Sequence, residues 1–163
     1  MHERVGIDLS NCPIGLSLDV LGQKWTLLIV REALNGVRRF SDFEAVLGCP
    51  RNLLASRLRM LCDQGILRTV IYEVLGERSR ARYELTEAGR ELAPTLIALF
   101  DWGLRHRASS RGQPAPARCR CGSPVHAVIE CEHGHRIDNT DSLTLPEWGE
   151  VSRERQLAPS RER

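Results

Sequence analysis

The pattern of apolar and polar residues in the first part of the chain predicts two helices. Between Leu16 and Leu34, apolar residues recur three or four positions apart, which places them on one face of a helix. Gly22 interrupts this pattern, and Asn35-Gly36 ends it in the way that glycine and asparagine commonly end helices. We therefore expect a short helix followed by a longer one.

A third, short helix is expected soon after these two. Ser41 stands three residues before Glu44, which is the spacing of a capping box, in which each side chain bonds a backbone N–H at the start of a helix. This pair predicts a helix that begins near Asp42 and ends near Leu47. Its apolar side chains are expected to face inward: Phe43, Val46 and Leu47.

A fourth helix should follow after a tight turn. Gly48-Cys49-Pro50 has the composition of a turn, and proline is favoured as the opening residue of a helix. The helix then runs to about Gln64, where Gly65 provides the C-terminal stop. At 100° per residue it is amphipathic, with one apolar side formed by Leu53, Leu54, Leu58 and Leu61.

A β-hairpin and a long helix are predicted next. Residues 66–75 are rich in β-branched and apolar types, a polar turn follows, and residues 81–85 form the returning strand. Thr86 caps a helix that continues to about His106, and Pro94 within it predicts a kink or a restart. One apolar stripe follows this helix: Leu92, Leu96, Leu99, Phe100 and Leu104.

This order of elements predicts a mainly α-helical protein with a small β-hairpin wing, the winged helix-turn-helix fold. In that fold the second helix of the motif enters the major groove of DNA. The alternative for residues 51–63 is an ordinary amphipathic surface helix that binds nothing. On the side opposite the leucines lie types that suit base edges or phosphates: Arg51, Asn52, Ala55, Ser56 and Arg59.

Basic residues gather around this motif. Residues 36–82 hold nine arginines and five acidic residues, whereas residues 108–163 hold eight of each. Arg57 falls toward the apolar flank of the fourth helix, so we expect it to bind a phosphate or to form an internal salt bridge. Backbone or minor-groove contacts are expected from residues before the motif and in the wing: Arg38, Arg39, Arg78, Arg80 and Arg82.

A set of ordered motifs resembles the HxlR-type winged helix-turn-helix regulators. The likeness covers about residues 10–106. It implies a homodimer held by the N-terminal region and the long helix, a near-palindromic operator, and a response to a small molecule or an oxidant. The motifs are Cys12-Pro13, Gly22-Gln23-Lys24-Trp25-Thr26, Gly36-x-x-Arg39-Phe40-Ser41-x-Phe43, Leu54-x-x-Arg57-Leu58-x-x-Leu61, Gly65, Tyr83-x-Leu85-Thr86-x-x-Gly89 and Trp102-Gly103.

Two further roles are considered for the cysteines. Cys12 matches a position that senses oxidants in some members of the family, which requires a partly exposed thiolate of low pKa. Its alternative role is packing at the dimer interface, and Cys49 and Cys62 are also interpreted as packing residues.

A structural zinc ion is a second hypothesis, with ligands from Cys119, Cys121, Cys131, His133 and His135. The alternative for that segment is a small hairpin in which residues 125–130 pair with 136–137.

The expected organisation is a DNA-binding and dimerisation domain over residues 1–107, a linker over 108–118, a Cys/His-rich extension over 119–149 and a disordered tail over 150–163.

No phosphate loop, dinucleotide-binding glycine pattern or nucleophile elbow is present in the sequence, so we expect that the protein is not an enzyme. No cofactor is expected to be required. Without a signal peptide or membrane span, a cytoplasmic protein is expected. The alternative function is a protein-interaction module on the same scaffold.

Overall fold

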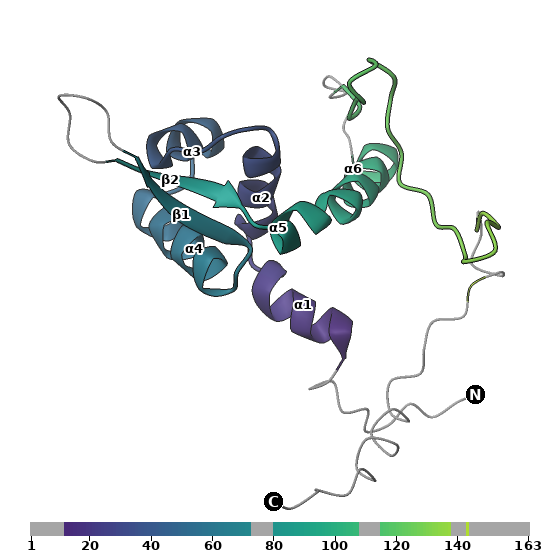
Figure 1. Ribbon diagram of the computed structural model, residues 1–163, viewed down its shortest axis with the longest axis horizontal. Coiled ribbons are helices and arrows are strands. Elements are labelled where there is room, and N and C mark those ends of the chain that lie inside the picture. Colours follow the sequence, from purple (N-terminus) through teal and green to yellow (C-terminus); the bar gives the residue numbers. More distant parts are fainter. Residues whose placement is uncertain (1–11, 73–79, 108–114, 138–142, 144–163) are drawn as a thin grey trace, which may run out of the picture. The chain divides into compact units, whose positions relative to one another are not determined.

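The computed structural model describes residues 12–72, 80–107, 115–137 and 143. These residues form six helices and one antiparallel hairpin, in the order helix, helix, helix, helix, strand, strand, helix, helix (Figure 1). This is the predicted winged helix-turn-helix architecture. The chain divides into two compact units, Val20–Val128 and Met1–Asp19 together with Ile129–Arg163. No helix in the described ranges is long and apolar enough to cross a bilayer.

The two predicted N-terminal helices are present as α1 (Pro13–Leu21) and α2 (Thr26–Leu34). The second is not the longer one, because each has nine residues. Trp25 adopts a left-handed backbone conformation with φ of 83°, which delays the start of α2 until Thr26. The predicted stop at Asn35-Gly36 is confirmed, since Gly36 has a φ of 95°, a value that glycine adopts without strain.

Helix α3 (Phe40–Leu47) begins before the predicted capping box. The amide N–H groups of Asp42 and Phe43 both donate to the carbonyl oxygen of Arg39, so Ser41 lies inside the helix and caps nothing. The capping-box prediction is therefore wrong. Phe43 is fully buried as predicted, but Val46 is 57% exposed because it lies on the flank of the helix.

Helix α4 (Arg51–Asp63) follows the turn at the predicted place. Gly48 ends α3 with a φ of 59°, Pro50 occupies the N-cap position of α4, and Gly65 closes it with a φ of 68°. Three of the four predicted core leucines are fully buried, whereas Leu53 is only partly buried. The amphipathic pattern of the sequence thus fixes which side of α4 faces solvent.

The wing consists of β1 (Leu67–Tyr72) and β2 (Arg80–Leu85), paired with Leu67 opposite Leu85 and Tyr72 opposite Arg80. After the wing, the predicted helix is divided into α5 (Glu87–Glu91) and α6 (Ala93–His106). Pro94 lies in the first turn of α6, where its missing N–H is tolerated, so the predicted restart is confirmed.

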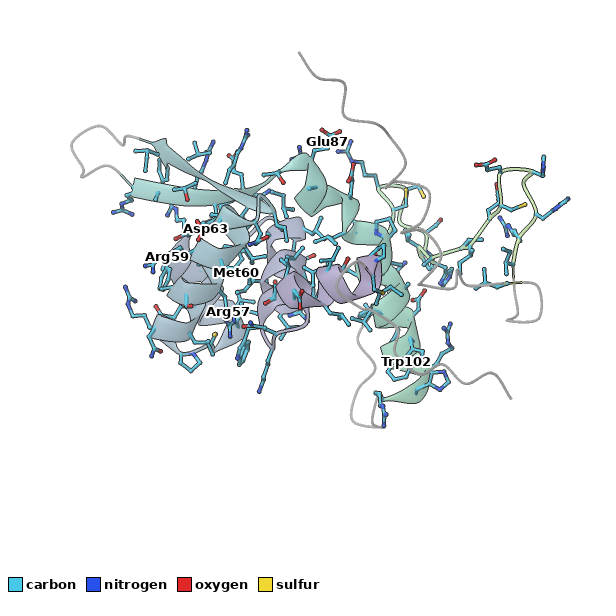
Figure 2. All side chains as sticks on the ribbon, turned by 90° about the horizontal axis from the view of Figure 1, so that it is seen from below. Arg57, Arg59, Met60, Asp63, Glu87 and Trp102 are labelled. Carbon is cyan, nitrogen blue, oxygen red and sulfur yellow. The ribbon has the colours of Figure 1, made fainter. Side chains whose placement is uncertain are left out.

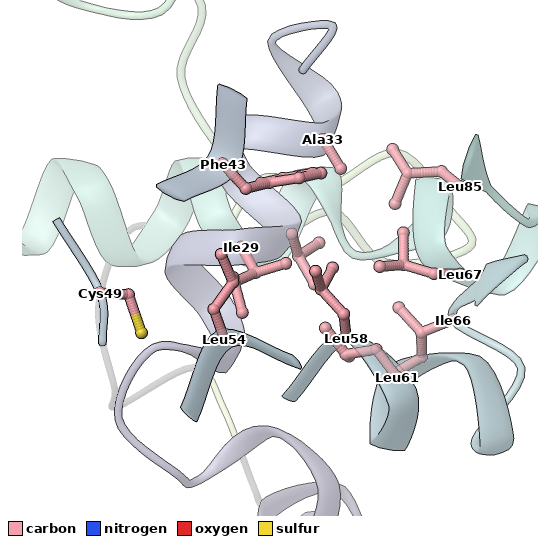
Figure 3. Close-up of a cluster of buried hydrophobic side chains, with 11 residues drawn as sticks. Ile29, Ala33, Phe43, Cys49, Leu54, Leu58, Leu61, Ile66, Leu67 and Leu85 are labelled. Carbon is pink, nitrogen blue, oxygen red and sulfur yellow. The ribbon is translucent and has the colours of Figure 1, made fainter. Parts of the chain in front are cut away.

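The core of the Val20–Val128 unit is one apolar cluster drawn from α2, α3, α4 and the hairpin (Figure 3). Because α3 and α4 both contribute fully buried side chains to it, the helix-turn-helix is fixed against the rest of the unit. The eleven members are Ile29, Val30, Ala33, Phe43, Cys49, Leu54, Leu58, Leu61, Ile66, Leu67 and Leu85.

Helix α6 contributes little to that core. Leu92, before its start, and Leu96 pack against the cluster, but no residue of α6 is itself buried. Leu99 is 48% exposed and Trp102 is 45% exposed. Of the predicted apolar stripe, Leu99 is exposed, and the other four residues are only partly buried: Leu92, Leu96, Phe100 and Leu104.

Candidate nucleic-acid interface

Side-chain contacts across the turn hold the start of α4 against α3. An Arg51 Nη1 atom lies 2.8 Å from Glu44 Oε2, and the Arg51 guanidinium stands 4.9 Å from the centre of the Phe40 ring. The Arg51 side chain is still 73% exposed. These contacts restrict the N-terminal end of α4, the end at which recognition helices approach base edges.

The solvent-facing side of α4 carries most of the residues predicted to read bases. Arg51, Asn52, Ser56 and Arg59 are exposed, and Ala55 is half-buried. Arg57 and Arg59 are labelled in Figure 2 and differ in setting. Arg57 is half-buried, and its Nε has no hydrogen-bond partner among the described residues, so the internal salt bridge considered for it is not formed there.

A second cluster of arginines surrounds Tyr72 at the end of β1. The Arg39 and Arg82 guanidiniums stand 5.9 Å and 5.8 Å from the centre of its ring, within the range of cation–π attraction. The cluster joins the residue before α3 to the wing. Sequence analysis missed Tyr72, although an aromatic residue at the end of a strand beside a basic turn was a usable signal.

Glu84 orders the arginines of the wing. Its carboxylate lies 2.9 Å from both Arg68 and Arg82. The hydrogen bond from Arg68 lowers the pKa of Glu84 most strongly, and the nearby charges of Arg82, Arg68 and Arg38 lower it further. Glu84 therefore stays ionised and fixes the direction of Arg82.

The remaining predicted contacts differ among themselves. Arg80 is exposed at the start of β2, whereas Arg78 lies outside the described residues. Arg38 is half-buried, and its Nη1 donates to the carbonyl oxygens of Ala33 at 2.5 Å and Val37 at 3.1 Å. The Arg38 guanidinium is thus turned into the protein, a setting that favours a structural role over the predicted phosphate contact.

Comparison with known proteins agrees with this geometry. The family model described as HxlR-like helix-turn-helix matches residues 20–111, more than half of the chain. The chain belongs to the HxlR-like helix-turn-helix family. It is 40% identical over 121 residues to the uncharacterized HTH-type transcriptional regulator Rv3095 of Mycobacterium tuberculosis, covering 74% of this chain and 75% of that protein.

Solved structures of other transcription regulators show the same fold. PA1607, a proposed transcription factor, is 33% identical with a TM-score of 0.74, and the match covers 85% of this chain and 96% of PA1607. The redox regulator HypR in its oxidized form is 30% identical with a TM-score of 0.55, over 60% of this chain and all of HypR. A DNA-binding transcriptional regulator family is thereby established for the chain.

In this HxlR-like chain the cysteines of the N-terminal part are poorly exposed. Cys12 is 6% exposed and Cys49 is 3% exposed. Burial raises the pKa of the Cys49 thiol, although the charges of Arg57 and Lys24 partly oppose this effect. The packing role favoured for Cys49 fits this burial, and the partly exposed thiolate required of a sensor at Cys12 does not.

The Cys/His segment of this HxlR-like chain forms two turns with the same backbone bonds. The Cys119 N–H donates to Ser123 O and the Gly122 N–H to Cys119 O, and twelve residues later Cys131 donates to His135 O and Gly134 to Cys131 O. Hydrogen bonds from Ser123 and from Cys119 lower the pKa of the exposed Cys121 thiol to about 7.

The zinc hypothesis gains no geometric support from these turns. Within the described part of the chain, no three Cys, His, Asp or Glu side chains come close enough to hold a metal ion. The alternative hairpin is present in part, because Glu130 bridges to Arg136 and the Ile137 N–H donates to Ile129 O, but Val125 pairs with Ala117 instead. Zinc therefore stays a prediction from the sequence.

Proposed function

We propose that this chain is a sequence-specific transcriptional regulator that binds a near-palindromic DNA operator as a homodimer and responds to a small molecule or an oxidant. The observation that carries the proposal is the exposed polar side of α4. Its opposite side is locked into the core by Leu54, Leu58 and Leu61, each 0% exposed. A helix held in this way offers a fixed row of polar side chains to the major groove.

Different residues of α4 are expected to contact different bases and phosphates of the DNA. Arg59 is expected to donate two hydrogen bonds to guanine, and the amide of Asn52 to bind adenine. Arg51 is expected to bind a phosphate or a base near the start of the helix while keeping its ion pair with Glu44. Base contacts give specificity, because phosphates carry no sequence information.

The arginines around Tyr72 are expected to grip the DNA backbone. Arg39 and Arg82 approach the same ring from different segments, which supports a joint contact with phosphates on one side of α4. Arg80, opposite Tyr72 at the loop end of the wing, adds a third positive charge. Each phosphate contact releases bound counterions, so binding is expected to weaken steeply as salt rises.

A second copy of the chain is the expected partner of α6. The helix leaves Leu99 and Trp102 half exposed, and large apolar side chains exposed together commonly mark an interface. Two copies related by a two-fold axis would place their α4 helices about 34 Å apart, one turn of DNA. This arrangement accounts for the expected near-palindromic operator.

A response to oxidants is supported by the names of two structurally similar regulators. HypR is named as a redox regulator, and the transcriptional regulator YodB of Bacillus subtilis, solved in its reduced form, is 25% identical with a TM-score of 0.51. In this chain the exposed Cys121, with its lowered pKa, meets the chemical requirement for an oxidant-sensitive thiol better than the buried Cys12.

The test is DNA binding by fluorescence anisotropy over a salt series. The purified chain is titrated into a labelled fragment from upstream of its own gene and into a scrambled fragment of equal length, with Arg82→Ala as the phosphate-contact variant and Arg120→Ala as the control. Preference for the upstream fragment, with a salt slope reduced by about one in Arg82→Ala, supports the proposal. Binding that is indifferent to salt and sequence supports a protein-interaction module instead.

A further inference from the structure

A cavity of about 390 Å³ lies between the end of α2, strand β2 and α5, apart from the exposed side of α4. This volume falls within the range of small-molecule sites, which is roughly 300 to 1,000 Å³. Ala33 and Leu85, which also belong to the core, are labelled in Figure 3. Six residues line the cavity: Ala33, Leu34, Arg38, Glu84, Leu85 and Arg90.

The two arginines of the cavity are anchored by the backbone. Arg38 Nη1 donates to Ala33 O and Val37 O, and Arg90 Nη1 donates to Leu85 O at 2.7 Å. A guanidinium carries five N–H donors, and these bonds use one nitrogen of each group. Within the described ranges, Nε and Nη2 of both residues make no hydrogen bond, so these donors can bind a ligand. Neither side chain has to be ordered from solution when it does so.

The one acidic residue in the lining does not cancel this charge. Glu84 is already paired at 2.9 Å with Arg68 and with Arg82, neither of which lines the cavity. Two further guanidiniums thus neutralise the Glu84 carboxylate, while Arg38 and Arg90 have no acidic partner among the ion pairs of the described residues. The cavity consequently combines net positive charge with a small apolar surface, mainly that of Leu34.

We infer that this cavity binds a small organic anion, a carboxylate with a short apolar body, as the effector of the regulator. Arg38 and Arg90 would take the carboxylate through paired N–H···O bonds, the geometry in which guanidinium and carboxylate fit best. Leu34, which is 36% exposed, and the edge of Leu85 would cover the apolar body. That the bound anion acts as an effector rests on the proposed function, whereas the binding site itself does not.

The cavity is joined directly to the DNA-facing residues. The Tyr83 N–H donates to Arg38 O at 2.8 Å, and Arg39, the next residue, belongs to the Tyr72 cluster. Glu84 lines the cavity and also holds Arg82 of that same cluster. An anion beside Glu84 would compete for this network and so change the positions of Arg39 and Arg82. By linkage, DNA must change the affinity for the anion by the same factor.

The site is tested on the full chain without DNA. Acetate, butyrate and benzoate, each at up to about 10 mM, are titrated while ¹H–¹⁵N correlation spectra are recorded, with acetamide, butyramide and benzamide as neutral counterparts. The expected result is saturable shifts at residues 33–38 and 84–90 for at least one carboxylate and not for its amide. In Arg90→Gln the affinity is expected to fall about tenfold or more, the loss of a charge-assisted hydrogen bond, whereas Arg120→Gln keeps it.

Three results would overturn the inference: no saturable shifts with any carboxylate, shifts that are equal for acid and amide, or affinity unchanged in Arg90→Gln when its spectrum shows a folded chain. The anisotropy assay is then repeated with the carboxylate that binds. Failure of DNA binding in that assay counts against the proposed function and leaves the anion site standing. Failure of the titration alone removes the anion site and leaves DNA binding standing.

Discussion

The carbonyl oxygen of Ile66 lies directly against the α-carbon of Gly89, leaving no room for a side chain between them. A β-carbon placed on Gly89 would collide with that oxygen and would come within 2.8 Å of Leu85 Cδ2. Thr86 completes the junction, since its N–H donates to Ile66 O and its hydroxyl accepts from the Gly89 N–H. The end of α4 and the start of α5 are joined at this point.

Gly89→Ala is therefore expected to destabilise the chain by about 1–3 kcal/mol, the usual cost of forcing an atom into a packed site. Gly103→Ala is the matched control, because Gly103 also lies in a helix and a β-carbon there meets nothing within 4 Å. That control is expected to be neutral or stabilising by up to about 1 kcal/mol. Urea unfolding of the two variants measures both effects, and equal stabilities would refute the close approach.

The uncovered face of α6 predicts a dimer that one substitution can break. Leu99→Asp places a charge in the expected interface, so the variant is expected to sediment as a monomer and to keep the circular dichroism of its helices. Val128→Asp is the control, because Val128 is also about half exposed, at 53%, but lies outside α6. Sedimentation velocity decides, and a Leu99→Asp variant that stays dimeric would place the interface elsewhere.

The ion pairs of Glu84 predict that the chain loses stability as the pH falls into the acid range. Because its pKa in the folded chain lies below the ordinary value of 4.5, Glu84 stabilises the fold above that value and loses this effect as the pH falls through the lowered pKa. Thermal unfolding between pH 7 and pH 3 is expected to show a gap between wild type and Glu84→Gln that closes at the acid end. Glu132→Gln, at an exposed position of the Cys/His segment, serves as the control, and a gap independent of pH would contradict the pairing.

Metal analysis addresses the Cys/His segment. The sequence hypothesis predicts about one zinc per chain in protein purified without chelator, and loss of that zinc in Cys131→Ala. Cys62→Ala is the control, because Cys62 lies at the end of α4, far along the chain from the Cys/His segment. Equal and negligible zinc in all three proteins would reject the hypothesis and leave two turns held by hydrogen bonds without a metal.

Local signals in the sequence were sufficient for most of the fold. Gly65, Thr86 and Pro94 each act through their own backbone or side chain, and each stops, caps or restarts a helix where expected. The leucine pattern of α4 likewise identified its buried side, and hence the exposed side that is proposed to read bases. These features depend on neighbours within one or two turns, which is why a sequence pattern reveals them.

Long-range contacts decided the rest. Arg38 reads as a basic residue before a DNA-binding motif, yet its guanidinium donates to Ala33 O and Val37 O. Its carbonyl oxygen accepts a hydrogen bond from the N–H of Tyr83, 45 positions later in the chain. The capping box failed for a local reason instead, because backbone bonds to Arg39 start α3 ahead of Ser41. The cavity and the Tyr72 cluster likewise bring together residues that no periodicity connects.

The central claim is that the exposed side of α4 reads base sequence, and Arg59→Ala tests it most directly. The measurement is the ratio of affinities for the upstream fragment and its scrambled counterpart, at one salt concentration, for wild type, Arg59→Ala and Arg120→Ala. The account predicts a loss of about 1–3 kcal/mol on the upstream fragment for Arg59→Ala, little change on scrambled DNA, and no change for Arg120→Ala. An Arg59→Ala variant that keeps the wild-type ratio would contradict it.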